Sequence, residues 1–394
     1  MTLLQDIQKQ FRQNIREYGI YIAFIFIIIF FQVSTHGLFL TGRNIGNLLN
    51  ATSYIAVLAV GMTLVIVIKH IDLSVGFLAG FLGAVAAIAM KYWLWPSSVS
   101  ILFVLILGIL AGLITAFLVA SLKIPAFVAT LAGALVYRGL LQTVTAGTGT
   151  IIIADKFYNA IGNGFITNIP DIGFLTTYNK TTLLLGIIAI VLYVRGEILT
   201  RRKTQAYNFE VLPRTLFILK LVIISVLIAA ISLVLAAYQG LTWAEVVLLI
   251  VVFIYSFITT KTVLGRHIYA VGGNPEAAEL SGISVKRITY VVFASMGLLT
   301  AVSAVLYSSW LRSATTIAGT LFELDAIAAA FVGGVAVAGG VGKVTGSIIG
   351  ALVMASLTNG MNLMGIDISL QYIVRGLVLA AAVIFDVTTR NRAK

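Results

Sequence analysis

Long apolar stretches repeat along the whole chain, and short polar segments separate each from the next. A helix that crosses the hydrocarbon core of a bilayer needs about 20 predominantly apolar residues, and the sequence offers about twelve such stretches. They lie near residues 19–35, 51–68, 74–90, 98–121, 126–145, 182–194, 216–238, 241–260, 289–309, 324–341, 345–363 and 372–388. The pattern predicts an all-α integral membrane protein with about twelve transmembrane helices.

The polar segments between these stretches are short. The longest cover residues 146–181, 195–215 and 261–288, and none is long enough for a soluble domain. We therefore expect a single transmembrane domain over residues 1–394. The first apolar stretch follows a polar segment and has no small-residue cleavage pattern after it, so we interpret it as a retained helix and not as a signal peptide.

Composition supports a membrane protein. Of the 394 residues, 60% are hydrophobic and 10% are charged, whereas soluble chains average about 45–50% apolar and about 25% charged residues. This excludes soluble enzymes and disordered chains. The absence of cysteine excludes disulfides, zinc–thiolate clusters and thiol nucleophiles.

The net charge of +12 predicts an orientation in the membrane. Lys and Arg concentrate in cytoplasmic loops. If the N-terminus is cytoplasmic, most of the 26 basic side chains fall on the cytoplasmic side. Both termini are then cytoplasmic, the number of crossings is even, and the run 324–341 must cross so that the basic tail 390–394 stays inside. The charge therefore marks loops facing the cytoplasm, and we do not interpret it as a nucleic-acid surface.

Glycines cluster in residues 333–350, which hold seven of them. Gly342, Gly346 and Gly350 are four residues apart, and this spacing lets the backbones of two helices approach closely. We expect tight packing within the subunit. The alternative is a lining of the transport path or a broken helix, chiefly at 333–342, where glycine doublets interrupt the pattern.

No catalytic or nucleotide site is visible. The segment around Lys343 resembles a phosphate-binding loop, but Val stands at position 337 and Val344 follows the lysine, so the Walker A pattern fails. His36, His70 and His267 lack partners at metal-ligand spacing. We expect no enzyme activity and no cofactor in this chain, and any ATP must bind to another polypeptide.

Two groups of polar residues are candidates for the transport path or its mouth. Asp72 and Ser74 lie between two predicted spans, where either one caps the next helix or both form a polar patch at the inner mouth. Asn359, Asn362 and Gln371 lie at span ends. Their amides either bind sugar hydroxyls or tie neighbouring helices together.

Charged residues near the predicted outer side form a third group. Glu323 and Asp325 begin the run 324–341, where carboxylates favour the positive end of a helix dipole. With Arg312 they are alternatively a docking contact for an external protein. Arg375 falls inside a predicted span, where a charge faces the interior of the bundle or reaches an interface.

The segment 261–288 carries the clearest local signals. Asn274 is a good N-cap, Pro275 suits the first helical position, Glu276 suits the positive end of the dipole, and Gly282 suits a helix stop. They predict a two-turn helix over 275–281. A helix this short is unstable alone in water, so the membrane surface or a partner must brace it.

These residues carry a family resemblance. Glu276, Ala277 and Ala278, followed by Gly282, resemble the EAA---G cytoplasmic loop of permease subunits of ATP-binding-cassette (ABC) importers. More specifically, the chain is similar to the monosaccharide permeases of the ribose and xylose type. The matching stretches follow the family's order along nearly the whole chain, at residues 44–49, 60–65, 71–76, 129–132, 269–274, 280–284, 323–329, 339–342 and 359–362.

The resemblance implies a core of about ten helices like that of type II importers, with 182–238 as a two-helix insertion of the xylose type. It implies a permease homodimer in the bacterial inner membrane, a separate ABC ATPase that uses ATP and Mg, and a periplasmic or extracellular sugar-binding protein. The segment 261–288 is then a cytoplasmic coupling loop. The residues that contact the ATPase are Asn274, Pro275, Glu276, Ala277, Ala278, Glu279, Leu280 and Gly282.

The alternative function is an ion-coupled secondary sugar transporter. Such proteins carry ionisable residues near the membrane midplane. Here the acidic residues are expected near span ends, which disfavours this class; they are Asp72, Glu245, Glu323, Asp325 and Asp386.

Overall fold

The computed structural model describes residues 15–170, 173, 176–209 and 211–391, with side chains for residues 19–388 among them. Both chain ends, whose cytoplasmic placement was predicted, lie outside the described residues. The elements in chain order are α2 (Ile15–Ser34), α3 (Gly42–Val67), α4 (Val75–Lys91), α5 (Ser97–Ala116) with a π-helical turn (Phe117–Ser121), α6 (Ala126–Thr145), β1 (Thr150–Ile152), α7 (Lys156–Asn163), α8 (Lys180–Ala206), α9 (Arg214–Tyr238), α10 (Trp243–Lys261), α11 (Val263–Gly273), α12 (Pro275–Leu280), α13 (Val285–Leu311), β2 (Ser313–Thr315), α14 (Phe322–Val332), α15 (Val344–Leu363) and α16 (Ile368–Asn391).

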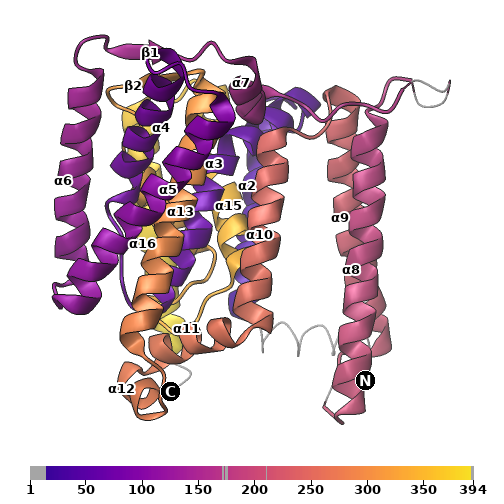
Figure 1. The fold of residues 1–394 in the computed structure, drawn as a ribbon. Helices are drawn as coiled ribbons and strands as arrows, with labels where there is room; N and C mark the ends of the chain where they lie inside the picture. Colours follow the sequence, from indigo (N-terminus) through magenta and orange to yellow (C-terminus); the bar gives the residue numbers. More distant parts are fainter. Residues whose placement is uncertain (1–14, 171–172, 174–175, 210, 392–394) are drawn as a thin grey trace.

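The long helices run side by side and form a bundle (Figure 1). The short helices α11 and α12 lie at one end of it, called here the α12 end, and α7 with the two strands lies at the other, called the strand end. Among the described residues, nine helices are long and apolar enough to cross a membrane, and α4 and residues 19–34 of α2 are shorter apolar helices. The prediction of an all-helical, multi-span membrane protein is confirmed.

The two strands were not predicted from the pattern of residues. β1 and β2 are three residues each and pair antiparallel, with Ile151 opposite Ala314. The pairing joins the end of α6 to the end of α13, since Ile153 N–H also donates to the Arg312 carbonyl at 2.9 Å. The strand end is therefore held together by backbone hydrogen bonds.

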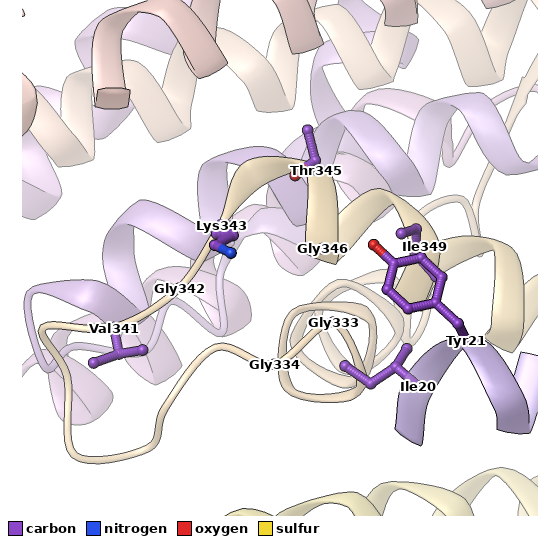
Figure 2. Close-up of a pocket in the computed structure, with 10 residues that line it drawn as sticks. All are labelled: Ile20, Tyr21, Gly333, Gly334, Val341, Gly342, Lys343, Thr345, Gly346 and Ile349. Carbon is purple, nitrogen blue, oxygen red and sulfur yellow. The ribbon is translucent and has the colours of Figure 1, made fainter. Parts of the chain in front are cut away.

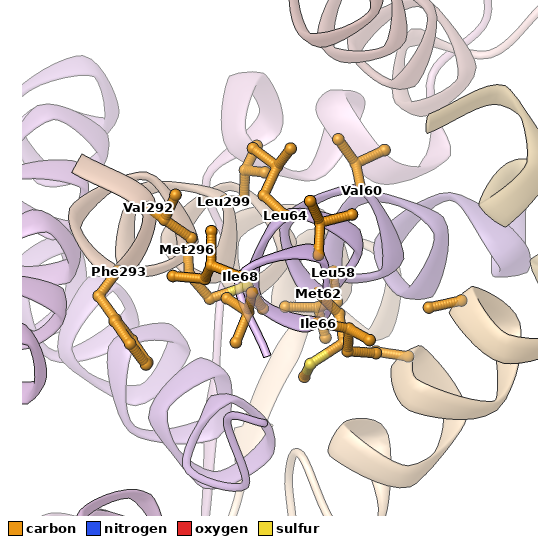
Figure 3. Packing of buried hydrophobic residues seen from close by; sticks show 14 of the residues in the cluster. Leu58, Val60, Met62, Leu64, Ile66, Ile68, Val292, Phe293, Met296 and Leu299 are labelled. Atoms are coloured by element: carbon orange, nitrogen blue, oxygen red, sulfur yellow. The ribbon is translucent and has the colours of Figure 1, made fainter. Parts of the chain in front are cut away.

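The centre of the bundle is the pair α3 and α13 (Figure 3). Within their most apolar stretches, 78% of α3 and 67% of α13 is buried. Met62 of α3 and Phe293, Met296 and Leu299 of α13 are almost fully buried there. A buried hydroxyl in this pair is satisfied by its own helix, as when Thr63 donates to the Ala59 carbonyl at 2.7 Å.

Glycines allow the closest helix pairs. Gly108 of α5 and Gly297 of α13 lie backbone to backbone, and Gly350 of α15 lies against the Ala329 carbonyl of α14. A side chain at these positions would overlap the neighbouring helix, so the predicted tight packing of glycines four residues apart is confirmed. Gly342 is different, because it lies in the loop before α15 and not in a helix.

The expected continuous helix over 324–341 is wrong in its second half. α14 ends at Val332, and a loop over residues 333–343 follows it. Gly334, Gly339 and Gly340 in this loop have positive φ, which other residues adopt only with strain. An 11-residue helix spans about 16 Å, half of a bilayer core. The broken-helix alternative is therefore the correct interpretation of this stretch.

The helices α8 and α9 form a hairpin beside the bundle (Figure 1). Only 11% and 6% of their most apolar stretches are buried. The hairpin contacts the bundle where Gly42 and Gly46 of α3 pack against Val234 and Tyr238 of α9.

Candidate functional site

The short helix α12 has the start and stop that the sequence predicted. The Asn274 side chain accepts a hydrogen bond from the Ala277 N–H at 3.1 Å, and Pro275 occupies the first turn. Gly282 has a φ of 83°, and the Ile283 N–H donates to the Ala278 carbonyl at 3.0 Å, which closes the helix. The predicted helix over 275–281 is confirmed as Pro275–Leu280.

One face of α12 is anchored and the other is free. Ala278 is buried in the main apolar core beside Ile283 and Val285. Glu276 and Glu279 are exposed, and Leu280 is 91% exposed. The free face thus carries two carboxylates and an exposed leucine on a helix too short to be stable alone, and its contact with an ATPase stays a prediction.

The helix α11 carries α12 across this end of the bundle (Figure 1). The Tyr269 hydroxyl of α11 donates to the Gly342 carbonyl in the 333–343 loop. Lys69, just past the end of α3, donates through Nζ to the Gly273 carbonyl at 3.1 Å. α11 is therefore fixed to two segments, the end of α3 and the 333–343 loop.

These two segments lead to the helices α4 and α14, which begin at the same place. The Gly76 backbone near the start of α4 touches the Gly319 backbone, and the Glu323 carboxylate of α14 lies against Gly76. From there α4 runs to Gly83, which packs on Ser308 near the strand end. α14 runs the opposite way, to the loop at the α12 end. α14 is a half-length helix and α4, with 17 residues, is longer. Helix N-termini that lie inside a bundle are a feature of transporters.

Asp72 and Ser74 form a closed turn in front of α4. Asp72 Oδ1 accepts hydrogen bonds from the Ser74 N–H at 2.9 Å and the Ser74 hydroxyl at 2.6 Å. Both residues are buried. Ser74 is the N-cap residue of α4, but its side chain makes no capping bond, so capping of α4 by these side chains is wrong. A role at the inner mouth stays a prediction.

The structure separates Arg312 from the two carboxylates that were grouped with it. Arg312 ends α13 at the strand end. Asp325 instead forms an ion pair with Arg375 of α16. Glu323 Oε2 is buried and has no hydrogen-bond partner among the described residues. Both carboxylates thus lie where α14 begins inside the bundle, and the expectation that they sit at the outer end of a full-length span is wrong. A docking role for the three residues stays a prediction.

The amide group ties helices together. Asn359 of α15 and Asn44 of α3 exchange two side-chain hydrogen bonds of 2.8 and 3.0 Å. Gln371 donates to Asn362 Oδ1 at 2.7 Å and to the Ile366 carbonyl at 2.9 Å. Of the two alternatives for Asn359, Asn362 and Gln371, the structure supports the tie between segments.

An aromatic cluster beside the start of α14 was not predicted from the sequence. The Phe322 ring lies 4.9 Å from Tyr307 and 5.1 Å from Tyr54, and Trp310 lies 6.0 Å from Tyr54 between ring centroids. Sugars stack on aromatic faces, so this cluster is a candidate contact near the carboxylates. Its members come from three distant stretches, and no local pattern connects them.

Two cavities adjoin the loop 333–343. Figure 2 shows the first, of about 220 Å³, between Gly333, Gly342 and Lys343 and the α2 residues Ile20 and Tyr21. The second, of about 400 Å³, is lined mainly by apolar side chains of α2, α14 and α16. Among the described residues, no group of three or more His, Cys, Asp or Glu could hold a metal ion.

The structure is a bundle of membrane-spanning helices with a capped, exposed helix at one end. This architecture is that of a membrane permease. The chain belongs to the family described as "Branched-chain amino acid transport system / permease component", which it matches over residues 44–383.

Relatives refine the family assignment. The chain is 38% identical to the xylose transport system permease protein XylH of Haemophilus influenzae, over 96% of this chain and 98% of that protein. It is 37% identical to XylH of Escherichia coli, over 96% and 94%, and 33% identical to the ribose import permease protein RbsC of Escherichia coli, over 88% and 87%. No solved structure gives a significant match.

Proposed function

We propose that this chain is the transmembrane permease subunit of an ABC importer for a monosaccharide, and that the sugar is xylose. Relatives named for xylose are more similar to the chain, at 38% and 37% identity, than those named for ribose, at 35% and 33%. The observation that carries the proposal is α12, a capped, exposed helix on a braced arm. It is the coupling helix that lies in a groove of the ATPase.

The proposed complex has two copies of this chain, two ATPase subunits that bind ATP and Mg, and an external sugar-binding protein. It lies in the bacterial inner membrane. ATP binding closes the ATPase pair, the coupling helices follow, and the permease switches between inward- and outward-facing states. The sugar-loaded binding protein docks at the strand end, where Arg312 lies.

The distribution of charge supports an α12 end that faces the cytoplasm. Lys261, Lys286 and Arg287 flank α11 and α12, Arg266 lies within α11, and Lys69 contacts α11. Basic residues of this density mark cytoplasmic loops. With α14 and its flanking segments as one crossing, the chain crosses twelve times and both termini are cytoplasmic.

The position of Glu323 changes one argument against an ion-coupled transporter. A buried carboxylate at the start of a half-length helix is a feature that such transporters also use. The argument against that class therefore rests on the family and on α12, because an ion-driven carrier needs no docking helix.

The test is transport by the reconstituted complex. In proteoliposomes with the ATPase and the binding protein, Glu276→Ala combined with Glu279→Ala should lower sugar uptake at least about tenfold, the effect of losing about 1.4 kcal/mol of contact free energy. ATP hydrolysis should continue. Asp367→Asn changes an exposed carboxylate that caps α16 at Ser369 and should leave uptake unchanged.

Two outcomes would overturn the proposal. Full ATP-driven uptake by the double variant contradicts the coupling role of α12. Sugar uptake by this chain alone, driven by an ion gradient, contradicts the ABC importer itself.

A further inference from the structure

Three backbone segments meet beneath the coupling helix. They are the last turn of α3 at Val67, the last turn of α11 at Gly272, and the loop 333–343 at Gly340; we call this contact the glycine junction. The Gly340 N–H donates to the Val67 carbonyl at 2.9 Å. A Cβ at Gly272 would overlap the Val67 carbonyl oxygen and lie 2.8 Å from Gly340 N. Only glycine lets these three backbones touch.

Side chains reinforce the glycine junction from both sides. The Lys69 ammonium bonds the Gly273 carbonyl, and the Tyr269 hydroxyl bonds the Gly342 carbonyl. Val67 and Val271 are buried beside it. α11 is bonded to the residues that follow α3 and to the loop 333–343. A displacement of α11 therefore displaces both of these segments where they contact it.

Each of these segments is connected to one of the helices α4 and α14. Residues 68–74 lead from Val67 into α4, and the loop 333–343 is the continuation of α14. The start of α4 at Gly76 contacts the Gly319 backbone, just before α14, and the Glu323 carboxylate in the first turn of α14. The glycine junction is thus linked to the start of α4 through residues 68–74 and to the start of α14 through α14 itself, and these two starts are in contact.

The loop has room to move. On its other side lies the cavity of about 220 Å³ shown in Figure 2, lined by Gly333, Gly334 and Gly342. The loop is packed on α15 at Gly333, but the pocket leaves the side of the loop at Gly334 and Gly342 without close packing, and this part can shift. Backbone rotation at the glycines absorbs such a shift, as at a hinge.

We propose that the glycine junction transmits the motion of the coupling helix to α4 and α14 together, and that Gly272 is its positioning residue. The inference rests on the proposed function. A side chain at Gly272 separates α11 from α3 and from the loop, so the ATPase can still bind α12 and hydrolyse ATP while α4 and α14 no longer follow.

The neighbouring glycine supplies a matched control. Nothing lies within 4 Å of a Cβ built at Gly273, and its carbonyl still accepts from Lys69 after substitution. Gly272→Ala and Gly273→Ala therefore make the same chemical change one residue apart, and only the first meets a backbone.

The experiment measures sugar molecules imported per ATP hydrolysed by the complete complex in proteoliposomes. The ratio is compared only among complexes in which the variant permease is folded and co-purifies with the ATPase, since ATPase subunits without a folded permease would lower the ratio by themselves. Gly272→Ala should lower the ratio at least about fivefold, the low end of typical coupling energies, and Gly273→Ala should leave it unchanged. Tyr269→Phe removes one hydrogen bond and should lower the ratio about two- to tenfold.

A wild-type ratio in Gly272→Ala overturns the inference. If Gly272→Ala does not fold, Tyr269→Phe decides, and a wild-type ratio in that variant overturns the inference. If the unaltered complex fails to import sugar with ATP, the proposed function itself fails, and the Gly273→Ala complex will fail equally.

Discussion

Two pairs of long apolar helices in this molecule have opposite surroundings. α8 and α9 are at least as apolar as α3 and α13, yet 11% and 6% of their most apolar stretches are buried, against 78% and 67%. Hydropathy therefore identifies what crosses the membrane, because lipid tails are as apolar as leucine, and it does not identify what packs against protein.

Residue size distinguishes the pairs better than hydropathy does. α3 and α13 bury Gly61 against Met296 and Leu299, and α13 places Gly297 against the α5 backbone. α9 presents mainly large aliphatic side chains to its surroundings, such as Val226 and Leu227. Small residues at helix contacts mark the protein-facing side of a membrane helix.

The largest expected effect comes from enlarging a glycine in the core. Gly297→Leu would push α13 away from the Gly108 carbonyl of α5, and a backbone cannot yield as a side chain does. We expect a loss of about 3 kcal/mol or more of unfolding free energy. Gly196→Leu in α8, with nothing within 4 Å, should cost nothing. Thermal unfolding in detergent followed by size-exclusion chromatography compares the two, and equal losses would contradict the distinction between core and hairpin.

Ion pairs provide an intermediate effect. Arg375→Met leaves Asp325 unpaired inside the bundle and should cost about 2 kcal/mol, below the range for fully buried pairs because both side chains retain about 20% exposure. Lys220→Met breaks the 2.8 Å pair with Glu197 in the hairpin, where Lys220 is 40% exposed, and should cost less than about 1 kcal/mol.

The same unfolding assay carries an internal control for these pairs. Arg375→Met combined with Asp325→Leu removes both charges and should recover most of the loss, since an apolar pair of similar size replaces a buried ion pair at little cost. A double variant as unstable as Arg375→Met would show that the charge on Asp325 is not the cause.

The smallest effect tests single hydrogen bonds. Asn359→Leu removes both bonds to Asn44 and should cost about 1 kcal/mol, as is typical between membrane helices. Tyr193→Phe in α8 removes a hydroxyl that has no hydrogen-bond partner among the described residues, so stability should change by less than about 0.5 kcal/mol. A larger loss in Tyr193→Phe than in Asn359→Leu would reverse the comparison.

The features that were predicted correctly from the sequence are those that depend on residues close together in the chain. The apolar stretches give the long helices, and Asn274 and Gly282 give both ends of α12, because capping depends on residues within one turn. The end of α14 was misplaced because Val and Ala continue the apolar pattern past Val332, while glycine conformation, which hydropathy ignores, ends the helix. The glycine doublets were the available signal.

Contacts between distant segments could not be predicted. The glycine junction joins residues 67, 272 and 340, and each of its glycines resembles many others in the chain. The partner of Arg375 was likewise unknown until the fold placed it beside Asp325. Such contacts follow from the packing of whole helices, and a single sequence records only their residue types.

The attachment of the α8–α9 hairpin has an evolutionary consequence. The Asn179 N–H donates to the Ala236 carbonyl at 2.8 Å, and the Asn179 side chain bonds the Gln239 carbonyl at 3.2 Å. The chain thus leaves the bundle before α8 and re-enters it after α9 at neighbouring points, as at sites that tolerate insertions. One genetic event could add or delete the whole hairpin and leave the course of the remaining helices intact.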